Sequence, residues 1–152
     1  MSENEIPIGF DEMPPDEREV NMKELETIQT ENRLNDVFAL GERGPGGARH
    51  VYQVFRQGAL EGDTLLHRNM DMGKLVLSIE FNGPRNEPGS MRGVTDADLL
   101  EIVRDRLTDF QAGPYPSPET ADALRYVTEA LLCMNRRTQD RAQRGVLGKN
   151  TP

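Results

Sequence analysis

Residues 117–148 read SPETADALRYVTEALLCMNRRTQDRAQRGVLG, and this stretch changes character part-way while it keeps the spacing of a helix. Ser117 and Pro118 are typical of a helix start, because the serine can accept a hydrogen bond from the first turn and the proline needs no N–H there. Gly145 predicts a left-handed cap at the other end. The apolar residues between them recur every three or four positions and predict one packed stripe: Leu124, Val127, Leu131 and Met134.

Three arginines follow where this stripe ends, namely Arg137, Arg141 and Arg144. At 100° per residue they project from the side of the helix that Ala123 and Ala130 occupy. One interpretation is a solvated helix end, where cations favour the negative pole of the helix dipole and pair with a nearby aspartate. The other is an anion site, because planar guanidiniums one turn apart can hold a phosphate or pyrophosphate with two forks. The pattern alone leaves both open.

A second helix is predicted to begin after Thr95 and to end at Gly113. Thr95 and Asp98 have the spacing of a capping box, and apolar residues follow at helical spacing as far as Phe110. The short link at residues 111–116 implies antiparallel neighbours and therefore a helical hairpin. Phe110 lies near the bend, where it can be a core side chain or a platform on which a base stacks.

Two stretches before the hairpin are predicted to be strands. Residues 50–56, HVYQVFR, are rich in valine and aromatic residues, and residues 74–81, KLVLSIEF, alternate between apolar and polar faces. They are expected to pair antiparallel across a long loop, with helices or a second subunit covering the pair. The loop that follows carries Arg85 and Arg92 among turn-forming residues. The expected fold class is therefore α+β, a small antiparallel sheet packed with a C-terminal two-helix hairpin.

The charge of the chain is concentrated at its beginning. Residues 1–36 hold 11 acids and 3 bases, whereas residues 37–152 hold 15 of each. Residues 1–48 are therefore expected to form an acidic tail, disordered at both ends, with a marginal helix between residues 15 and 40. Residues 49–152 are expected to form the binding domain.

The composition argues against several classes of protein. A neutral domain with clustered arginines favours a small anionic partner over DNA or RNA, which usually need a broadly basic face. The lone cysteine, Cys133, fits a reducing compartment, and no apolar run has the length of a membrane span. His50 and His67 lack metal-ligand spacing, and no catalytic constellation stands out. We therefore expect a non-enzymatic binding protein without a metal or cofactor.

Several ordered motifs resemble the phage Thoeris anti-defence proteins of the first type, which share a hairpin domain name with anti-CBASS sponges. The resemblance covers about residues 74–148. Its motifs are, in chain order, Asn82-Gly83-Pro84-Arg85, Gly93-Val94-Thr95, residues 98–103 (DLLEIV), residues 105–107 (DRL), residues 110–115 (FQAGPY), Glu129-Ala130-Leu131, and Arg137-Thr138 followed by Arg141, Arg144-Gly145-Val146 and Gly148.

This resemblance implies a phage sponge in the cytoplasm of an infected bacterium. Such a protein binds a cyclic ADP-ribose isomer made by TIR enzymes without degrading it, as a homodimer or a dimer-based hexamer, and some members also hold cyclic di- or trinucleotides. By resemblance, Arg137 and Arg141 would grip the phosphates, Arg85 would close the pocket and Phe110 would stack on the adenine.

One position departs from the family pattern. Thr120 stands where the family usually has an asparagine near the ligand, which implies either a changed ligand preference or weaker binding. Two other classes of function remain as alternatives. The hairpin and the acidic tail can serve as a protein–protein adaptor, or the arginine end can bind nucleic acid with a steep dependence on salt.

Overall fold

The computed structural model describes residues 20–83, 92–149 and 151–152, and they form two compact units that divide between Ile79 and Glu80. The first unit is built on a sheet and the second on two helices. The predicted disorder at the beginning of the chain falls largely on residues 1–19, which lie outside the described residues, as does Arg85. Each unit is taken by itself below.

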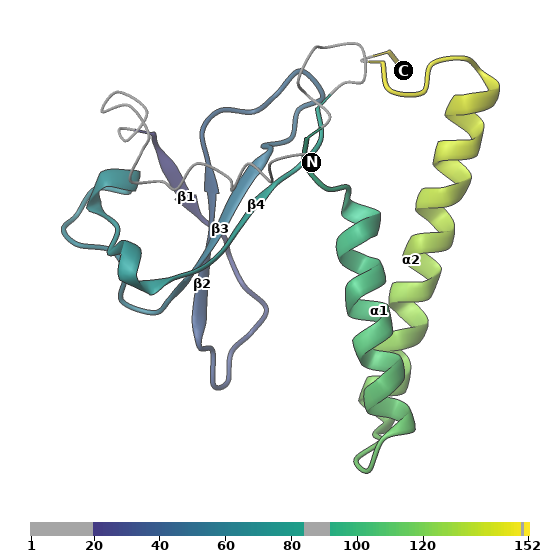
Figure 1. Cartoon of the computed structure of the whole chain (residues 1–152), viewed down its shortest axis with the longest axis horizontal. Helices are drawn as coiled ribbons and strands as arrows, with labels where there is room; N and C mark the ends of the chain where they lie inside the picture. Colours follow the sequence, from purple (N-terminus) through teal and green to yellow (C-terminus); the bar gives the residue numbers. More distant parts are fainter. Residues whose placement is uncertain (1–19, 84–91, 150) are drawn as a thin grey trace, which may run out of the picture. The chain divides into compact units, whose positions relative to one another are not determined.

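The sheet unit contains four strands in the order β1 (Met22–Glu24), β2 (Asn35–Leu40), β3 (Val51–Arg56) and β4 (Leu75–Glu80). Neighbours along the chain are neighbours in the sheet, and all pairs are antiparallel (Figure 1). In β2 and β3, Asn35 pairs with Arg56 and Leu40 with Val51. With the two helices that follow, this confirms the predicted α+β class.

Both strands that were predicted from sequence are confirmed, within one residue at each end. The prediction of residues 50–56 corresponds to β3, and that of residues 74–81 to β4. They are neighbours in the sheet, as expected, and the long connection between them contains two short 3₁₀ turns, His67–Asn69 and Met72–Lys74. β4 is an edge strand with both faces partly open, since Val76 and Leu77 are each about half exposed.

The marginal helix expected between residues 15 and 40 is wrong for the described part of that range, because residues 20–40 hold the two strands β1 and β2 and no helix. Leu25 N donates to Val37 O at 2.8 Å, which extends the pairing of the two strands beyond β1. Residues 41–49, expected to be a disordered end, are the connection between β2 and β3 and carry their own hydrogen bonds, such as Arg49 Nε to Gly41 O at 2.9 Å. The sheet unit thus includes most of the region that was predicted to be a tail ending at residue 48.

The core of the sheet unit explains why this region folds. It is formed by six buried apolar side chains, to which β1 and β2 contribute three: Met22, Phe38, Leu40, Phe55, Ala59 and Met70. Phe38 and Phe55 meet edge to face, with ring centroids 5.8 Å apart, an arrangement that aromatic pairs favour. Without β1 and β2 the pair β3–β4 would lack half of its apolar partners and would be marginal by itself.

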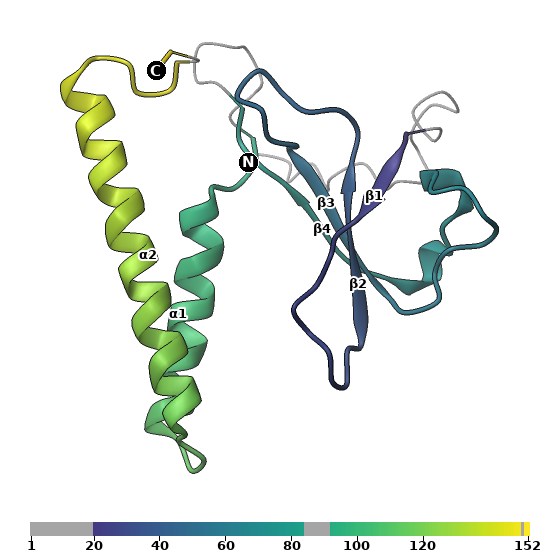
Figure 2. The same ribbon diagram turned by 180° about the vertical axis from the view of Figure 1, so that it is seen from behind.

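The helical unit consists of α1 (Asp96–Ala112) and α2 (Pro118–Gln143), which lie side by side as the predicted antiparallel hairpin (Figures 1 and 2). Thr95 and Asp98 form the expected capping box, and Ser117 caps α2 by accepting a hydrogen bond from Thr120 N at 3.0 Å. Gly145 has φ 69° and ends α2 as predicted. Local capping chemistry therefore determines where both helices begin and where the second ends.

Candidate functional site

The arginine end of α2 is divided among three different environments. Arg144 pairs with Asp140 at 2.8 Å, as the solvated-end interpretation expected for one of the arginines. Arg141 is partly buried and donates to three main-chain carbonyl oxygens, those of Val146, Lys149 and Thr151, at 3.0, 2.7 and 2.9 Å. Arg137 is exposed, and none of the described residues forms a hydrogen bond or an ion pair with its guanidinium.

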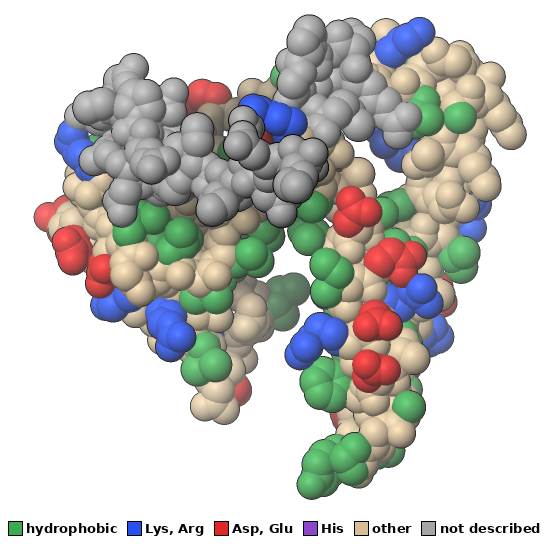
Figure 3. Space-filling model, in the orientation of Figure 1, with side chains coloured by type: hydrophobic (Ala, Val, Ile, Leu, Met, Phe, Trp, Pro, Cys, Tyr) green, Lys and Arg blue, Asp and Glu red, His purple; other side chains and the backbone are tan. Residues whose placement is uncertain are grey.

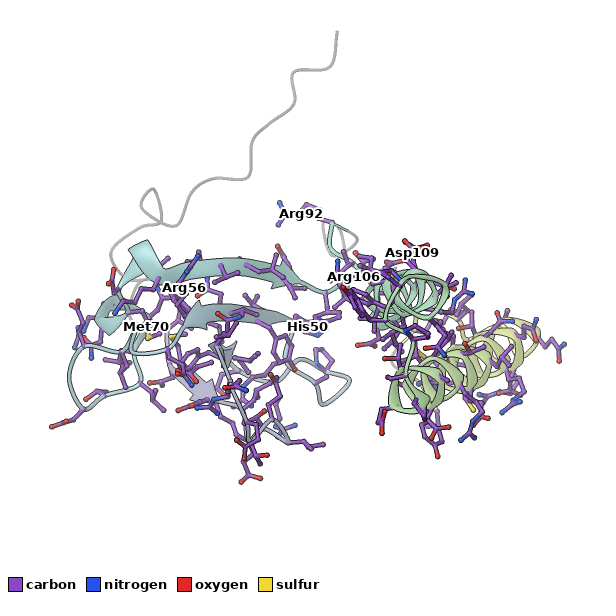
Figure 4. The ribbon with its side chains drawn as sticks, turned by 90° about the horizontal axis from the view of Figure 1, so that it is seen from below. His50, Arg56, Met70, Arg92, Arg106 and Asp109 are labelled. Carbon is purple, nitrogen blue, oxygen red and sulfur yellow. The ribbon has the colours of Figure 1, made fainter. Side chains whose placement is uncertain are left out.

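The bend of the hairpin holds two of the predicted site residues. Phe110 lies in the last turn of α1 with its side chain 55% exposed, so it is not a core residue within this chain. The guanidinium of Arg106 lies over its ring, 5.4 Å from the centroid, and Figure 4 labels Arg106 and Asp109 on the same helix. Thr120 is in the first turn of α2, where its hydroxyl accepts a hydrogen bond from the Ser117 hydroxyl at 2.9 Å. An open aromatic ring near a helix N-terminus is a suitable surface for a stacking nucleotide base.

The four predicted site residues that the structure describes do not come together within one chain. Arg137 is about 28 Å along the axis of α2 from Pro118, at 1.5 Å per residue, whereas Phe110 is beside the bend. The two residues are therefore about 25 Å apart along an antiparallel hairpin, which exceeds the length of a mononucleotide-sized ligand. Arg137 and Arg141 form one part of the candidate site, and Phe110 and Thr120 form another.

The hairpin also leaves a large part of its apolar surface open. No side chain of α1 or α2 is fully buried, although both helices lie within the described residues. Figure 3 shows apolar and acidic side chains together along α1. Six large apolar or aromatic side chains of this unit are at least 42% exposed: Ile102, Val103, Phe110, Tyr115, Tyr126 and Leu132. Such a surface is typical of an interface with another molecule.

Over 77 residues the chain is 42% identical to a protein named Thoeris anti-defense 1, from Bacillus phage SBSphiJ7. The predicted resemblance to Thoeris anti-defence proteins is confirmed. The match covers 50% of this chain and 53% of the phage protein, so the chain spans about half the length of the curated relative that it matches. No protein-family model matches the chain.

Arg85, which by resemblance would close the pocket, lies outside the described residues, but the residues on either side of 84–91 contact each other. Phe81 and Val94 form a parallel bridge, and Asn82 N donates to Val94 O at 2.9 Å. Gly93 N donates to Asn82 Oδ1 at 2.8 Å. These contacts bring the chain on either side of residues 84–91 together, directly before α1 begins.

Sequence reasoning missed Arg106 as a neighbour of Phe110. The signal was present, because residues four apart on a helix lie on the same face and Arg106 is one turn before Phe110. From the sequence, Arg141 was expected either at a solvated helix end or in an anion site, whereas its guanidinium donates to three main-chain carbonyl oxygens. That contact depends on how the chain turns after Gly145, which no periodicity predicts.

Two further observations concern metal ions and membranes. Within residues 20–83, 92–149 and 151–152, no three histidine, cysteine, aspartate or glutamate side chains gather as ligands for a metal ion. None of the helices in that part of the chain has the length and apolar composition that crossing a membrane requires.

Proposed function

We propose that this protein is a phage anti-defence protein that binds a cyclic ADP-ribose-type immune signal and sequesters it without cleaving it. The similarity to Thoeris anti-defense 1 supports a role in anti-defence. The observation that carries the rest is the guanidinium of Arg137, which forms no hydrogen bond or ion pair with any described residue and lies one helical turn from Arg141. Guanidiniums spaced in this way can neutralise a pyrophosphate through charge-assisted hydrogen bonds.

The separation of the two parts of the site argues that two copies of the chain build it. If a second hairpin lies antiparallel to the first, its bend with Phe110 and Thr120 comes beside Arg137 and Arg141 of the first. The same arrangement covers Ile102 and Val103, which are 58% and 42% exposed in one chain. A homodimer would therefore hold two equivalent sites, each with phosphate-binding groups from one copy and a stacking ring from the other. Hexamers built from such dimers fit the same proposal.

The proposed mechanism is stoichiometric binding rather than catalysis. Each charge-assisted hydrogen bond to a phosphate contributes about 1.5–3 kcal/mol, and base stacking on Phe110 adds about 1–3 kcal/mol. Several such contacts reach the roughly 12 kcal/mol that nanomolar binding requires. The partner is a small cyclic nucleotide, including cyclic di- or trinucleotides as further candidates. We propose that it acts in the cytoplasm of the infected host and needs no cofactor.

The test compares two neighbouring arginines. The protein is incubated with the product of a TIR enzyme, the dissociation constant is measured by calorimetry, and the ligand is recovered after heat denaturation and identified by mass spectrometry. Arg137→Gln is expected to weaken binding by about 10- to 100-fold, because one charge-assisted fork is lost. Arg136→Gln is the matched control, since Arg136 is also exposed but donates to Cys133 Sγ at 3.0 Å on another face of α2.

Each outcome distinguishes the proposal from its alternatives. Recovery of intact signal supports sequestration, and recovery of an altered molecule would mean that the protein is an enzyme. An equal loss of affinity in the Arg137 and Arg136 variants would mean that binding depends on net charge rather than on a defined site. If the signal does not bind and a host or phage protein is retained through residues 1–48, the protein is an adaptor. A gel shift with steep salt dependence would instead indicate nucleic-acid binding.

A further inference from the structure

The chain turns back on itself after α2 and returns to the helix end. Gly145 and Gly148 both have positive φ, 69° and 76°, which lets the chain curl within a few residues. Val146 N donates to Arg141 O at 3.0 Å and Lys149 N to Val146 O at 3.1 Å. We call residues 146–149 together with 151–152 the return segment.

The return segment occupies the guanidinium of Arg141. The Nη2 atom donates to Val146 O at 3.0 Å and to Lys149 O at 2.7 Å, and the Nη1 atom donates to Thr151 O at 2.9 Å. Arg144 Nη1 also donates to Pro152 O at 3.0 Å. Two of the arginines at the end of α2 are therefore bound to main-chain oxygens of the same short segment.

Like the oxygens of a phosphate group, these three carbonyl oxygens accept hydrogen bonds from one guanidinium. A carbonyl oxygen carries only a partial charge, so it binds a guanidinium less strongly than a phosphate oxygen does. A phosphate that approaches Arg141 must nevertheless displace bonds that already exist. The protein thus contains a weaker, tethered ligand for one of its own arginines, and the tether gives that ligand a high effective concentration.

We propose that the return segment is an internal competitor that holds Arg141 in the unliganded protein and leaves it when a pyrophosphate-containing nucleotide binds. This inference rests on the proposed function, because it assumes that Arg141 is one of the phosphate-binding groups. It adds that Arg137 makes the first contact with the nucleotide. The phosphate then replaces the return segment at Arg141. The affinity of the protein is then lower than its arginines alone would give, since each binding event includes release of the segment.

A shortened chain that ends at Gly148 tests this directly. It lacks the carbonyl groups of Lys149, Thr151 and Pro152 but keeps Val146 O and the cap at Gly145. With the TIR product as the probe, the shortened chain is expected to bind about tenfold more tightly than the full chain. The sign is informative, because loss of the positive charge of Lys149 would by itself weaken the binding of an anion.

Two controls separate competition from a merely structural role. Lys149→Gln removes the same charge, keeps the carbonyl groups and is expected to bind no more tightly than the full chain. In an Arg141→Gln background the shortening is expected to change the affinity by less than about twofold, because the segment then occupies no phosphate-binding guanidinium. If the segment only stabilises the helix end, shortening lowers the melting temperature and leaves the affinity unchanged, which overturns the inference while the proposed function stands.

Hydrogen exchange of the full chain provides a second readout. Addition of the TIR product is expected to raise the exchange rate of the Lys149 amide, which donates to Val146 O at 3.1 Å, and to leave the Leu131 amide protected within α2. Binding without faster exchange at Lys149 contradicts the inference. If the shortened chain binds the signal and the full chain does not, competition is supported in its strongest form. If neither binds it, the proposed function fails and the inference fails with it.

Discussion

Replacing Gly93 with alanine is expected to loosen the junction that precedes the helical hairpin. A Cβ atom at this position would overlap the carbonyl oxygen of Glu80 and would lie 2.7 Å from the carbonyl carbons of Glu80 and Phe81. A Cβ atom is almost never found so close to another heavy atom. The atoms that it would meet belong to the main chain, so they cannot move away by a change of rotamer. The two chain segments must therefore move apart.

The size of the effect follows from the hydrogen bonds that this movement breaks. Val94 N donates to Glu80 O and Asn82 N to Val94 O, both at 2.9 Å, and Gly93 N donates to Asn82 Oδ1 at 2.8 Å. Each contributes about 0.5–1.5 kcal/mol net, so the loss of all three lowers the free energy of unfolding by about 1.5–4.5 kcal/mol. For a unit of this size, that corresponds to a melting temperature lower by roughly 6 °C or more.

Thermal unfolding followed by helical circular dichroism measures this loss. Gly46→Ala is the matched control, because a Cβ atom there meets nothing within 4 Å, and it is expected to leave the melting temperature nearly unchanged. The junction also holds the ends of the loop that carries Arg85, so Gly93→Ala is expected to weaken binding of the TIR product at temperatures where the helices remain folded. A Gly93→Ala protein that melts within about 1 °C of the native chain would refute the reasoning.

Two further predictions concern the sheet unit and the start of α1. Burial lowers the pKa of His67 below its usual 6.5, so the unfolded chain binds more protons and the free energy of unfolding falls as the pH drops from 6.5 toward the lowered pKa. Urea denaturation between about pH 7.5 and 5.5 checks this, and an equal slope in His67→Gln would contradict it. Thr95→Ala removes the hydroxyl that accepts a hydrogen bond from Asp98 N, and it is expected to lower the free energy of unfolding, measured by the same assay, by about 1 kcal/mol. Thr108→Ala, in the middle of α1, is the control and is expected to be neutral or stabilising.

The helices were predictable from sequence because their signals are local. Thr95 with Asp98 and Ser117 with Pro118 determine the helix starts through contacts within one turn, and Gly145 determines an end in the same way. β1 and β2 were missed because these strands form only by pairing with segments that lie elsewhere in the sequence. Their strongest local signal was the apolar run at residues 37–40, next to a glycine, but the surrounding charges favoured a polar tail.

The candidate site was predictable only in part, for the same physical reason. The spacing of Arg137 and Arg141 placed them one turn apart, and the exposure of Phe110 agrees with a ring that is available to a ligand. The carbonyl groups around Arg141 depend on a backward turn of the chain, which side-chain periodicity does not report. The distance between Phe110 and Arg137 required the lengths and the antiparallel arrangement of both helices.

The charges of the hairpin bear on how two copies would meet. α1 carries five acids and two arginines, whereas residues 134–144 carry four arginines and one aspartate. A parallel pair of hairpins would bring two basic ends together, and only a bound anion would offset the repulsion between their guanidiniums. An antiparallel pair instead brings each basic end beside the acidic helix of the other copy and its Phe110. Electrostatics therefore favours the arrangement that the proposed two-copy site would require, with or without a bound ligand. In that proposed arrangement Asp109, which precedes Phe110 in the chain, would compete with the signal for the guanidiniums of the other copy, so the affinity would depend on how much better a pyrophosphate fits them than a carboxylate does.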